Sequence, residues 1–274
     1  KTRITIPSYM RNSFRFCSIH ILFYTYIIAL MEKIMNSIYK RVIIKLSGES
    51  LSDSKNSLIY DSNKLKNVAS VIKEIVSTGT QVGIVVGAGN IWRGRLAEKI
   101  GIDHSTADYM GMLGTIMNAL AIQSAIEDNG VACRVMSSIN VPQVCEPYIR
   151  RKAMTYLDKG IVTIFAGGTG NPYFTTDTTS TLRALEVEAD AILMAKNGVD
   201  GVYDSDPRKN KDAHLIKKLA FHEVVEKQLQ VMDLTAVAML ENTNVIIRVF
   251  NMDDTSSFMK VLIGEDIGTT ISRE

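Results

Sequence analysis

The sequence predicts an α/β protein, a three-layer αβα sandwich built around a central, mostly parallel sheet. From Tyr39 onward, short apolar runs rich in β-branched residues alternate with longer amphipathic segments. This alternation needs crossover connections, and crossovers cover both faces of parallel strands with helices. Several apolar runs are followed at once by loops rich in glycine or threonine. Open parallel sheets bind their ligands beyond such strand ends, so these loops are the first place to look for a site.

The strands are expected where apolar residues follow one another without a break, because strands buried on both faces are apolar throughout. In chain order they are Arg41–Leu46, Gln81–Val86, Val131–Met136, Ile161–Ala166, Ala189–Ala195 and Val245–Phe250. A last pair of strands is expected near Val261–Gly264 and Thr269–Ser272. Helices are expected between the strands, where apolar residues recur at helical spacing. They cover Asp61–Ser77, Thr106–Asn129, Tyr148–Leu157, Thr178–Glu188, Phe221–Lys227 and Asp233–Glu241.

Composition indicates a soluble globular protein, with 46% hydrophobic and 22% charged residues among 274. The three cysteines, Cys17, Cys133 and Cys145, form no CxxC motif and no Cys/His cluster, which argues against a disulfide framework and a zinc site. We therefore expect a reduced, cytoplasmic protein. Residues 1–34 carry five basic residues and one glutamate, so the remaining 240 residues sum to −2 out of a total of +2. A mildly acidic body argues against a nucleic-acid partner.

Residues 1–34 are expected to lie outside the fold, as a disordered or artefactual N-terminal extension that activity does not need. Their apolar stretch Ile21–Leu30 is ten residues long, too short to span a bilayer, so no membrane association is expected. The native start is expected at Met31 or Met35, with a targeting role for the extension as the alternative. Residues 35–274 are expected to form the folded domain, with two lobes at about 39–188 and 189–274.

Four loops that follow strands carry candidate binding residues, namely Lys45–Glu49, Gly87–Gly94, Ala166–Thr178 and Lys196–Pro207. Each alone is also explained by an ordinary turn, a helix cap or a surface loop. Neither GxGxxG nor GxxxxGK[ST] occurs in them, so no dinucleotide fingerprint or P-loop is present. Together, at one sheet edge, their glycines, hydroxyls and cations suit several phosphates. Phosphoryl transfer fits such a site, because it needs mainly positioning and charge neutralisation.

Seven segments then occur in a recognisable order: KLSGE (45–49), GAGNIWRG (87–94), TADYMGML (106–113), GTGNPYFTTD (168–177), AKNGVDGVYDSDP (195–207), VMDLTA (231–236) and IRVFNM (247–252). Together they closely resemble bacterial-type UMP kinases, also called uridylate kinases, of the amino-acid kinase superfamily. The resemblance runs from about Tyr39 to the C-terminus. Its most specific part is GTGNPYF with the following TTD, and then DGVYxxDP.

The resemblance implies transfer of the ATP γ-phosphate to UMP, giving UDP and ADP in de novo pyrimidine nucleotide synthesis. It implies Mg²⁺ bound through the ATP phosphates, with no metal site made of protein side chains alone. The implied catalytic residues are Lys45, Arg93 and Asp177. The C-terminal lobe is expected to bind ATP, and the implied ATP-binding residues from both lobes are Lys45, Leu46, Ser47, Gly48, Gly89, Arg93, Asn197, Tyr203 and Asp206. The implied UMP-binding residues, in the N-terminal lobe, are Ala88, Asp108, Thr169, Gly170, Asn171, Pro172, Tyr173, Phe174, Thr175 and Thr176.

One of these residues departs from the family pattern, and for another the matching position in the family is less direct. Ala88 stands where many relatives have glycine, and Asn197 lies in a loop whose length varies. Asp108 also has a plain interpretation, since the helix dipole favours a carboxylate in the first turn of a helix.

The resemblance further implies a homohexamer that GTP activates and UTP inhibits, without nucleic-acid or membrane partners. Two other functions stay open at this point. One is a sibling kinase that phosphorylates an amino acid, another small carboxylate or carbamate. The other is a catalytically idle pyrimidine-nucleotide sensor.

Overall fold

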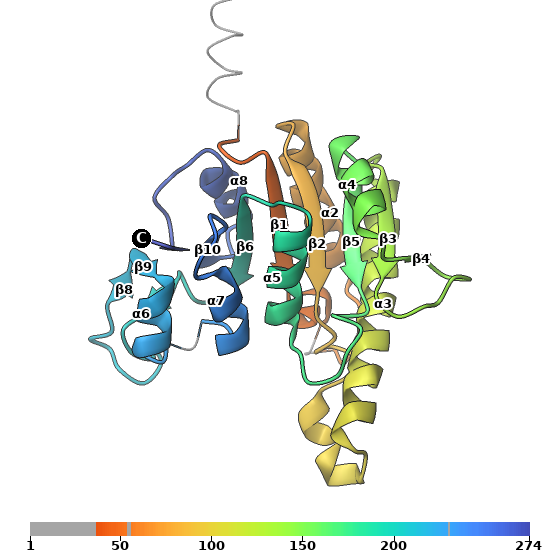
Figure 1. Ribbon diagram of the computed structural model, residues 1–274, viewed down its shortest axis with the longest axis horizontal. Coiled ribbons are helices and arrows are strands. Elements are labelled where there is room, and N and C mark those ends of the chain that lie inside the picture. Colours follow the sequence, from red (N-terminus) through yellow and green to blue (C-terminus); the bar gives the residue numbers. More distant parts are fainter. Residues whose placement is uncertain (1–36, 54–55, 230) are drawn as a thin grey trace, which may run out of the picture. The chain divides into compact units, whose positions relative to one another are not determined.

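A nine-stranded sheet runs through the part of the chain that the computed structural model describes, residues 37–53, 56–229 and 231–274 (Figure 1). Its spatial order is β4-β3-β5-β2-β1-β6-β10-β11-β9, and every neighbouring pair is parallel except β10 and β11. The strands are β1 (Arg41–Leu46), β2 (Gln81–Val86), β3 (Cys133–Ser137), β4 (Glu146–Pro147), β5 (Val162–Ala166), β6 (Ala191–Lys196), β9 (Lys218–Ala220), β10 (Ile246–Asn251) and β11 (Thr269–Ser272). A separate antiparallel pair consists of β7 (Val202–Tyr203) and β8 (Leu215–Ile216). The expected mostly parallel sheet is confirmed.

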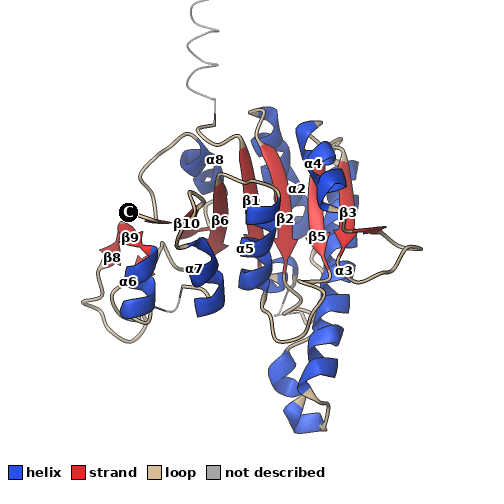
Figure 2. Ribbon diagram, in the orientation of Figure 1, coloured by secondary structure: helices blue, strands red, loops and turns tan. Residues whose placement is uncertain are grey.

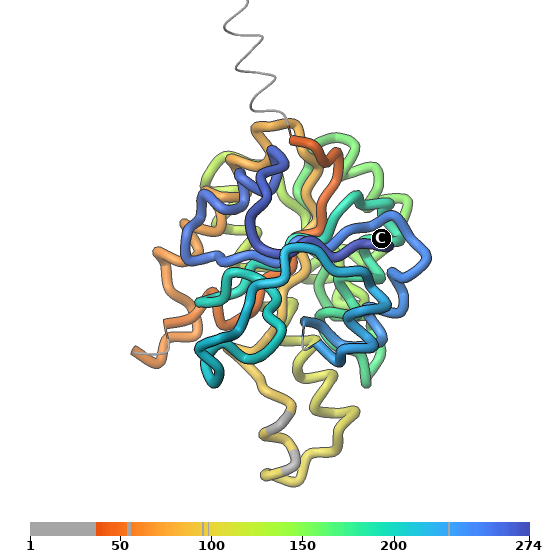
Figure 3. Tube along the Cα trace, turned by 90° about the vertical axis from the view of Figure 1, so that its left-hand side faces the viewer, coloured from red at the N-terminus to blue at the C-terminus, as the bar shows by residue number. Residues whose placement is uncertain are grey.

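Helices cover both faces of the sheet, which completes the predicted three layers (Figures 2 and 3). They are α2 (Ser62–Ser77), α3 (His104–Asp128), α4 (Arg150–Asp158), α5 (Thr176–Glu186), α6 (Phe221–Glu226), α7 (Leu234–Leu240) and α8 (Ser256–Leu262). Side chains of α2, α3 and α8 belong to one hydrophobic cluster, and those of α4 to α7 belong to another. The sheet therefore separates two cores.

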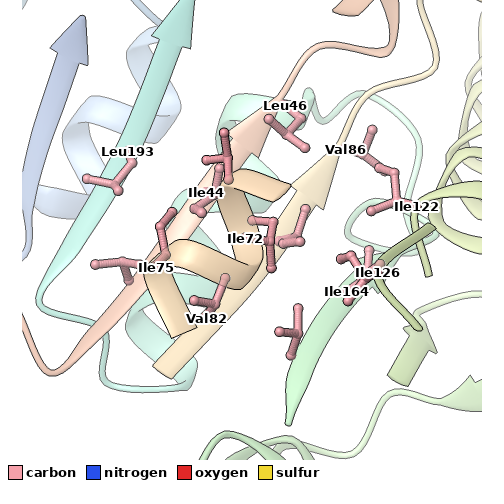
Figure 4. Close-up of a cluster of buried hydrophobic side chains, with 14 of the residues drawn as sticks. Ile44, Leu46, Ile72, Ile75, Val82, Val86, Ile122, Ile126, Ile164 and Leu193 are labelled. Carbon is pink, nitrogen blue, oxygen red and sulfur yellow. The ribbon is translucent and has the colours of Figure 1, made fainter. Parts of the chain in front are cut away.

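Strand β1 supplies both cores, because successive side chains of a strand point to opposite faces. Ile44 packs in the cluster of Ile72 from α2 and Ile122 from α3 (Figure 4). Its neighbour Ile43 packs in the opposite cluster, with Leu157 of α4. Burial on both faces explains why β1 reads as an unbroken apolar run up to Lys45.

One expected strand is wrong. Val261–Gly264 is the end of helix α8 and the turn after it, not a strand. Phe258, Val261 and Leu262 have the spacing of one helix face and are buried together in the cluster with α2. A short apolar run cannot be assigned to helix or strand by hydrophobicity alone. The expected partner strand, Thr269–Ser272, is present as β11.

Helix α3 is, among the described residues, the helix long and apolar enough to cross a membrane by length and composition. It packs instead along α2, β3 and β5, and nine of its residues are buried. A core helix of a folded domain passes the same criterion.

The expected extension at residues 1–34 lies outside the described residues. Residues 37–274 form one compact unit. The two lobes within it stay a prediction.

Candidate active site

The carboxyl ends of β5, β2, β1 and β6 lie next to one another, because these four strands are parallel neighbours in the sheet. They end at the lower edge of the sheet in Figure 1. The four loops singled out in the sequence follow these strands, so the fold gathers them at one edge.

Two lysines and one aspartate meet at this edge. Lys45 near the end of β1 makes an ion pair with Asp177 in the first turn of α5, with 2.8 Å between Nζ and Oδ1. Lys196, the last residue of β6, donates a hydrogen bond to the Val231 carbonyl at 3.0 Å. Burial and the nearby positive charge of Lys45 hold the pKa of Lys196 below its ordinary value, and Asp177 partly offsets this. The edge therefore concentrates positive charge.

Lys196 was not among the predicted site residues. The signal that could have found it is its position, since Lys196 ends the strand next to β1, and Lys45 lies one residue before the end of β1.

The loop after β1 packs tightly on the loop after β2. A Cβ atom on Gly48 would lie 2.4 Å from Asn90 Oδ1 and 2.6 Å from the Gly87 carbonyl oxygen. Glycine is therefore needed here for contact between two protein loops. Ser47 caps the short 3₁₀ turn that follows, its hydroxyl accepting from the Glu49 N–H at 3.3 Å. Leu46 is buried in the core, so any contact it makes with a nucleotide uses its backbone.

A pair of hydrogen-bonded asparagines, one of them buried, supports the glycine turn after β2. Asn118 of α3 is fully buried and donates to the Gly87 carbonyl at 2.7 Å and to Asn90 Oδ1 at 2.8 Å. Asn90 in turn donates to the Ile59 carbonyl at 3.0 Å. These contacts fix the direction of the turn that the sequence assigned to phosphate binding. Asn118 was missed because an asparagine inside a long apolar helix carries no local signal.

Arg93 connects the same two loops from the exposed side. Its Nη2 makes an ion pair with Glu49 Oε1 at 2.6 Å, and its Nε donates to the Gly89 carbonyl at 3.1 Å. Both charged side chains are largely exposed, so this pair contributes little stability. Its guanidinium stands beside the glycine turn, within reach of a ligand bound there.

A cavity of about 270 Å³ lies between the glycine turn, α3 and the start of α5. Of the predicted UMP-binding residues, Ala88, Asp108, Phe174, Thr175 and Thr176 line it, as does Gly89 from the ATP-binding set. The predicted stretch from Thr169 to Tyr173 lies outside that lining, although the neighbouring Gly168 belongs to it. Trp92 also lines the cavity, held by a 2.8 Å hydrogen bond from Nε1 to the Ala107 carbonyl.

Asp108 ties the threonine-rich loop to the start of α3. Its Oδ2 accepts a hydrogen bond from the Tyr173 N–H at 2.7 Å and lies 3.2 Å from His104 Nδ1. Tyr173 has a φ of 70°, which is left-handed and uncommon for a residue with a side chain. Its ring stacks on His104 with 4.8 Å between centroids, and its hydroxyl accepts from Ser105 at 3.2 Å. The Tyr173 ring therefore lies against α3, while its backbone contacts Asp108.

Thr175 caps α5, which begins two residues earlier than the sequence predicted. Its hydroxyl accepts from the Asp177 N–H at 3.0 Å and donates to Asp233. Asp233 also accepts from Thr178 at 2.8 Å and from the Ala236 N–H at 2.8 Å, which caps α7. Burial alone would raise the pKa of Asp233, but these hydrogen bonds hold it below its ordinary value. One carboxylate thus joins the starts of two helices beside the lysines.

A second cavity, of about 620 Å³, lies beyond β6. The predicted ATP-binding residues Asn197, Tyr203 and Asp206 all line it, and so does Lys196. Burial and the charge of Asp200 raise the pKa of Tyr203, so its phenol stays neutral. Lys196 lines this second cavity and Thr176, the neighbour of Asp177, lines the first, so the group of lysines and Asp177 adjoins both cavities.

Comparisons with known proteins show the family of this chain. The model of the amino acid kinase family matches residues 40–251. The uridylate kinase of Limosilactobacillus reuteri (strain DSM 20016) is 52% identical over 233 residues, which cover 85% of this chain and 97% of that protein. The crystal structure of UMP kinase from Bacillus anthracis matches with a TM-score of 0.84 and 45% identity, over 86% of this chain and 97% of the other.

A UMP kinase from Ureaplasma parvum matches with a TM-score of 0.81 and 38% identity, over 85% of this chain and 98% of the other. Similarity at this level over nearly the whole length of several relatives is more than a shared fold. The chain belongs to the uridylate kinases of the amino acid kinase family.

Proposed function

We propose that this protein transfers the γ-phosphoryl group of ATP to UMP, with UDP and ADP as products, in de novo pyrimidine nucleotide synthesis. The observation that carries the proposal is the group of Lys45, Asp177 and Lys196 between two cavities. Lys196 lines the cavity beyond β6, and Thr176, next to Asp177, lines the cavity beside α3. ATP in the first cavity and UMP in the second would direct their phosphates toward this group.

Each member of the group has a defined task in the transfer. A UMP phosphate oxygen attacks the γ-phosphorus in line while the bond from phosphorus to the ADP oxygen breaks, so no covalent enzyme intermediate forms. Lys45 and Lys196 stabilise the negative charge on the transferring group. Asp177 holds the Lys45 ammonium through the 2.8 Å ion pair. The N-terminus of α5 adds partial positive charge on the same side.

The remaining predicted residues bind or orient the nucleotides. Arg93 grips phosphate beside the glycine turn of Ala88 and Gly89. Asp108 accepts from the ribose of UMP. The loop residues Thr169 to Thr176 read the uracil edge, with backbone and hydroxyl groups. A site that hydrogen-bonds one base edge rejects a base whose donors and acceptors are exchanged, because buried groups then lose their partners. We therefore expect UMP to be strongly preferred over CMP.

Mg²⁺ is the implied cofactor. The described residues contain no group of three or more His, Cys, Asp or Glu side chains that could hold an ion by themselves. Mg²⁺ in phosphoryl transfer is held mainly by substrate phosphates with one or two carboxylates. Asp177 Oδ1 already faces the Lys45 ammonium at 2.8 Å, so we assign the ion to the ATP phosphates. The ion supplies charge neutralisation on the ATP phosphates.

The two alternative functions are less well supported. An amino-acid or carbamate kinase needs no cavity lined by Asp108 and the threonines of the loop. An idle nucleotide sensor needs no paired lysines at the meeting point of two cavities. The relatives of high coverage are named uridylate kinases.

Self-association is part of the proposal. Tyr109, Leu113 and Met117 follow one another every four residues on α3 and are 44%, 48% and 51% exposed. Such a stripe of large apolar side chains on one helix face is typical of a protein–protein contact. We assign it to a second copy of this chain, within a homohexamer. Activation by GTP, inhibition by UTP and a cytoplasmic location complete the proposal.

An acceptor panel tests the function. ADP release from ATP and Mg²⁺ is followed by a coupled assay with UMP, CMP, AMP, aspartate or carbamate as acceptor. Of the five acceptors, we expect only UMP to give rapid ADP release. Rapid turnover with aspartate or carbamate would indicate the sibling kinase, and tight UMP binding without ADP release would indicate the sensor.

A further inference from the structure

Arg183 of α5 is a buried cation that the proposed reaction does not use. Only 3% of its surface is exposed. Its guanidinium lies 3.8 Å from the ring centroid of Tyr148 and makes an ion pair with Glu186. Glu186 also accepts from the Tyr148 hydroxyl at 2.7 Å. A positive charge is thus enclosed beneath the threonine-rich loop.

The other end of this cluster reaches the backbone of that loop. Arg183 Nη2 donates to Ser138 Oγ at 2.7 Å, and Ser138 Oγ donates to the Gly168 carbonyl at 2.9 Å. Nη2 itself lies 3.5 Å from the same carbonyl oxygen. Gly168 lines the cavity assigned to UMP. The buried cluster therefore acts on a residue at the cavity wall.

The loop follows a left-handed backbone path against this contact surface. Gly167, Gly168 and Gly170 all have left-handed φ angles, of 73°, 58° and 84°. A Cβ atom on Gly170 would lie 3.2 Å from both Cβ and the carbonyl oxygen of Ser138. Glycines of this kind are highly flexible in an unrestrained chain. Contacts with the rest of the protein must therefore select one conformation. At the Gly168 carbonyl, Ser138 and Arg183 supply these contacts.

These contacts set the direction of the peptide group between Gly168 and Thr169. In a trans peptide the C=O and the following N–H point in opposite directions. Holding the Gly168 oxygen on Ser138 and Arg183 therefore directs the Thr169 N–H away from them.

Stability alone is a poor reason for this arrangement. A buried ion pair is often no more stabilising than apolar residues of the same size. The Nε atom of Arg183 is buried without a hydrogen-bond partner among the described residues, which costs further free energy. Arg183 thus holds the Gly168 carbonyl, directly and through Ser138, while its own Nε is left without a partner among the described residues.

We propose that Arg183 and Ser138 are positioning residues for the acceptor nucleotide, which fix the Gly168–Thr169 peptide so that the loop binds UMP. The inference rests on the proposed function for its ligand. It concerns acceptor affinity and leaves ATP binding unaffected.

Three variants test it. Ser138→Ala removes the hydroxyl that bridges Arg183 and Gly168. Arg183→Lys keeps the charge beside Glu186, but a lysine cannot contact Glu186 and Ser138 with a rigid fork. Tyr148→Phe is the matched control, because it removes one hydrogen bond to Glu186 and leaves both the ring under the guanidinium and the link to Gly168.

UMP affinity is measured by calorimetric titration, and the KM of each substrate by the coupled assay. We expect Ser138→Ala and Arg183→Lys to raise the Kd and KM for UMP about tenfold, the loss of roughly one good hydrogen bond, with the KM for ATP unchanged. Tyr148→Phe should lower the Tm but leave the UMP affinity of wild type. Equal UMP affinity in Ser138→Ala and wild type, or an equal loss in Tyr148→Phe, would overturn the proposal.

Amide hydrogen exchange of the 167–170 segment gives a readout that needs no ligand. Exchange at Gly170, whose N–H donates to the Gly167 carbonyl at 3.0 Å, should be faster in Ser138→Ala and Arg183→Lys than in wild type and Tyr148→Phe. If wild-type protein fails to phosphorylate UMP, the proposed function fails, and this exchange pattern still decides the positioning claim. Unchanged exchange in both variants would refute it.

Discussion

Replacing Asp108 by asparagine tests how the acceptor nucleotide is held. In the structure Oδ2 of Asp108 accepts from the Tyr173 N–H at 2.7 Å and lies 3.2 Å from His104 Nδ1. Asp108 also lines the cavity assigned to UMP. We expect its second oxygen, Oδ1, to accept from the ribose hydroxyls. Asparagine keeps an acceptor for Tyr173, so the loop stays attached while the negative charge is lost.

The size of the effect follows from that charge. A hydrogen bond to a charged group contributes about 1.5–3 kcal/mol, and a neutral one about 0.5–1.5 kcal/mol. When the hydrogen bonds to one or two ribose hydroxyls change from charged to neutral, the lost free energy raises the KM for UMP by about tenfold or more. The KM for ATP should stay within about twofold of wild type, because Asp108 lines the cavity assigned to UMP and not the one assigned to ATP.

The assay compares UMP with deoxy-UMP, which lacks the 2′-hydroxyl. Wild type should discriminate against deoxy-UMP, and Asp108→Asn should discriminate much less. His104→Ala is the matched control, since it removes the stacked ring and the 3.2 Å contact of Nδ1 with Asp108 but keeps the carboxylate. If wild type and Asp108→Asn discriminate equally, Asp108 does not read the 2′-hydroxyl, and its role is that of a helix-end stabiliser.

Three further variants probe the lysines and the loop contact. Lys45→Ala should lower kcat by about a hundredfold or more while the thermal unfolding curve is kept, because one preorganised charge stabiliser is lost; near wild-type turnover would contradict the site assignment. The pKa of Lys196 is lowered from 10.5, and activity needs its protonated form, so kcat/KM for ATP should fall as pH rises through a value below 10.5. Lys196→Arg should move this alkaline limb to higher pH, and an unmoved limb would exclude Lys196 as its origin. Gly48→Ala should destabilise the fold by about 1–3 kcal/mol in urea unfolding, since its Cβ would lie 2.6 Å from the Gly87 oxygen. Gly94→Ala, with nothing within 4 Å, should be close to neutral and serves as its control.

The sheet and its ligand edge were predictable from the sequence for a physical reason. Strands buried on both faces must be apolar throughout, so β1, β2, β5, β6 and β10 stand out as apolar runs. Parallel strands must end at one edge, so the loops after them must meet. The family pattern implied Lys45 and Asp177 as catalytic residues, and their ion pair at 2.8 Å is a contact that the structure adds.

Contacts between distant segments were not predictable in this way. The hydrogen bond from Asn118 to the Gly87 carbonyl joins residues 31 positions apart, and nothing in the local pattern around either residue indicates it. Tyr173 was expected to bind UMP, and no local sequence pattern indicated that its left-handed backbone would place its ring on His104. Short pairings such as β7 and β8, of two residues each, carry no periodicity that a sequence pattern can reveal. The end of α8 was predicted as a strand for the same reason, since this helix has only seven residues.

The most direct test of the account follows the phosphoryl group itself. ATP labelled at the γ-phosphate is incubated with the purified protein, Mg²⁺ and UMP, and the labelled products are separated. We expect the label to appear in the β-phosphate of UDP, at a rate that Lys45→Ala lowers by about a hundredfold. Label released as inorganic phosphate, or retained entirely in ATP by folded wild-type protein, would contradict it.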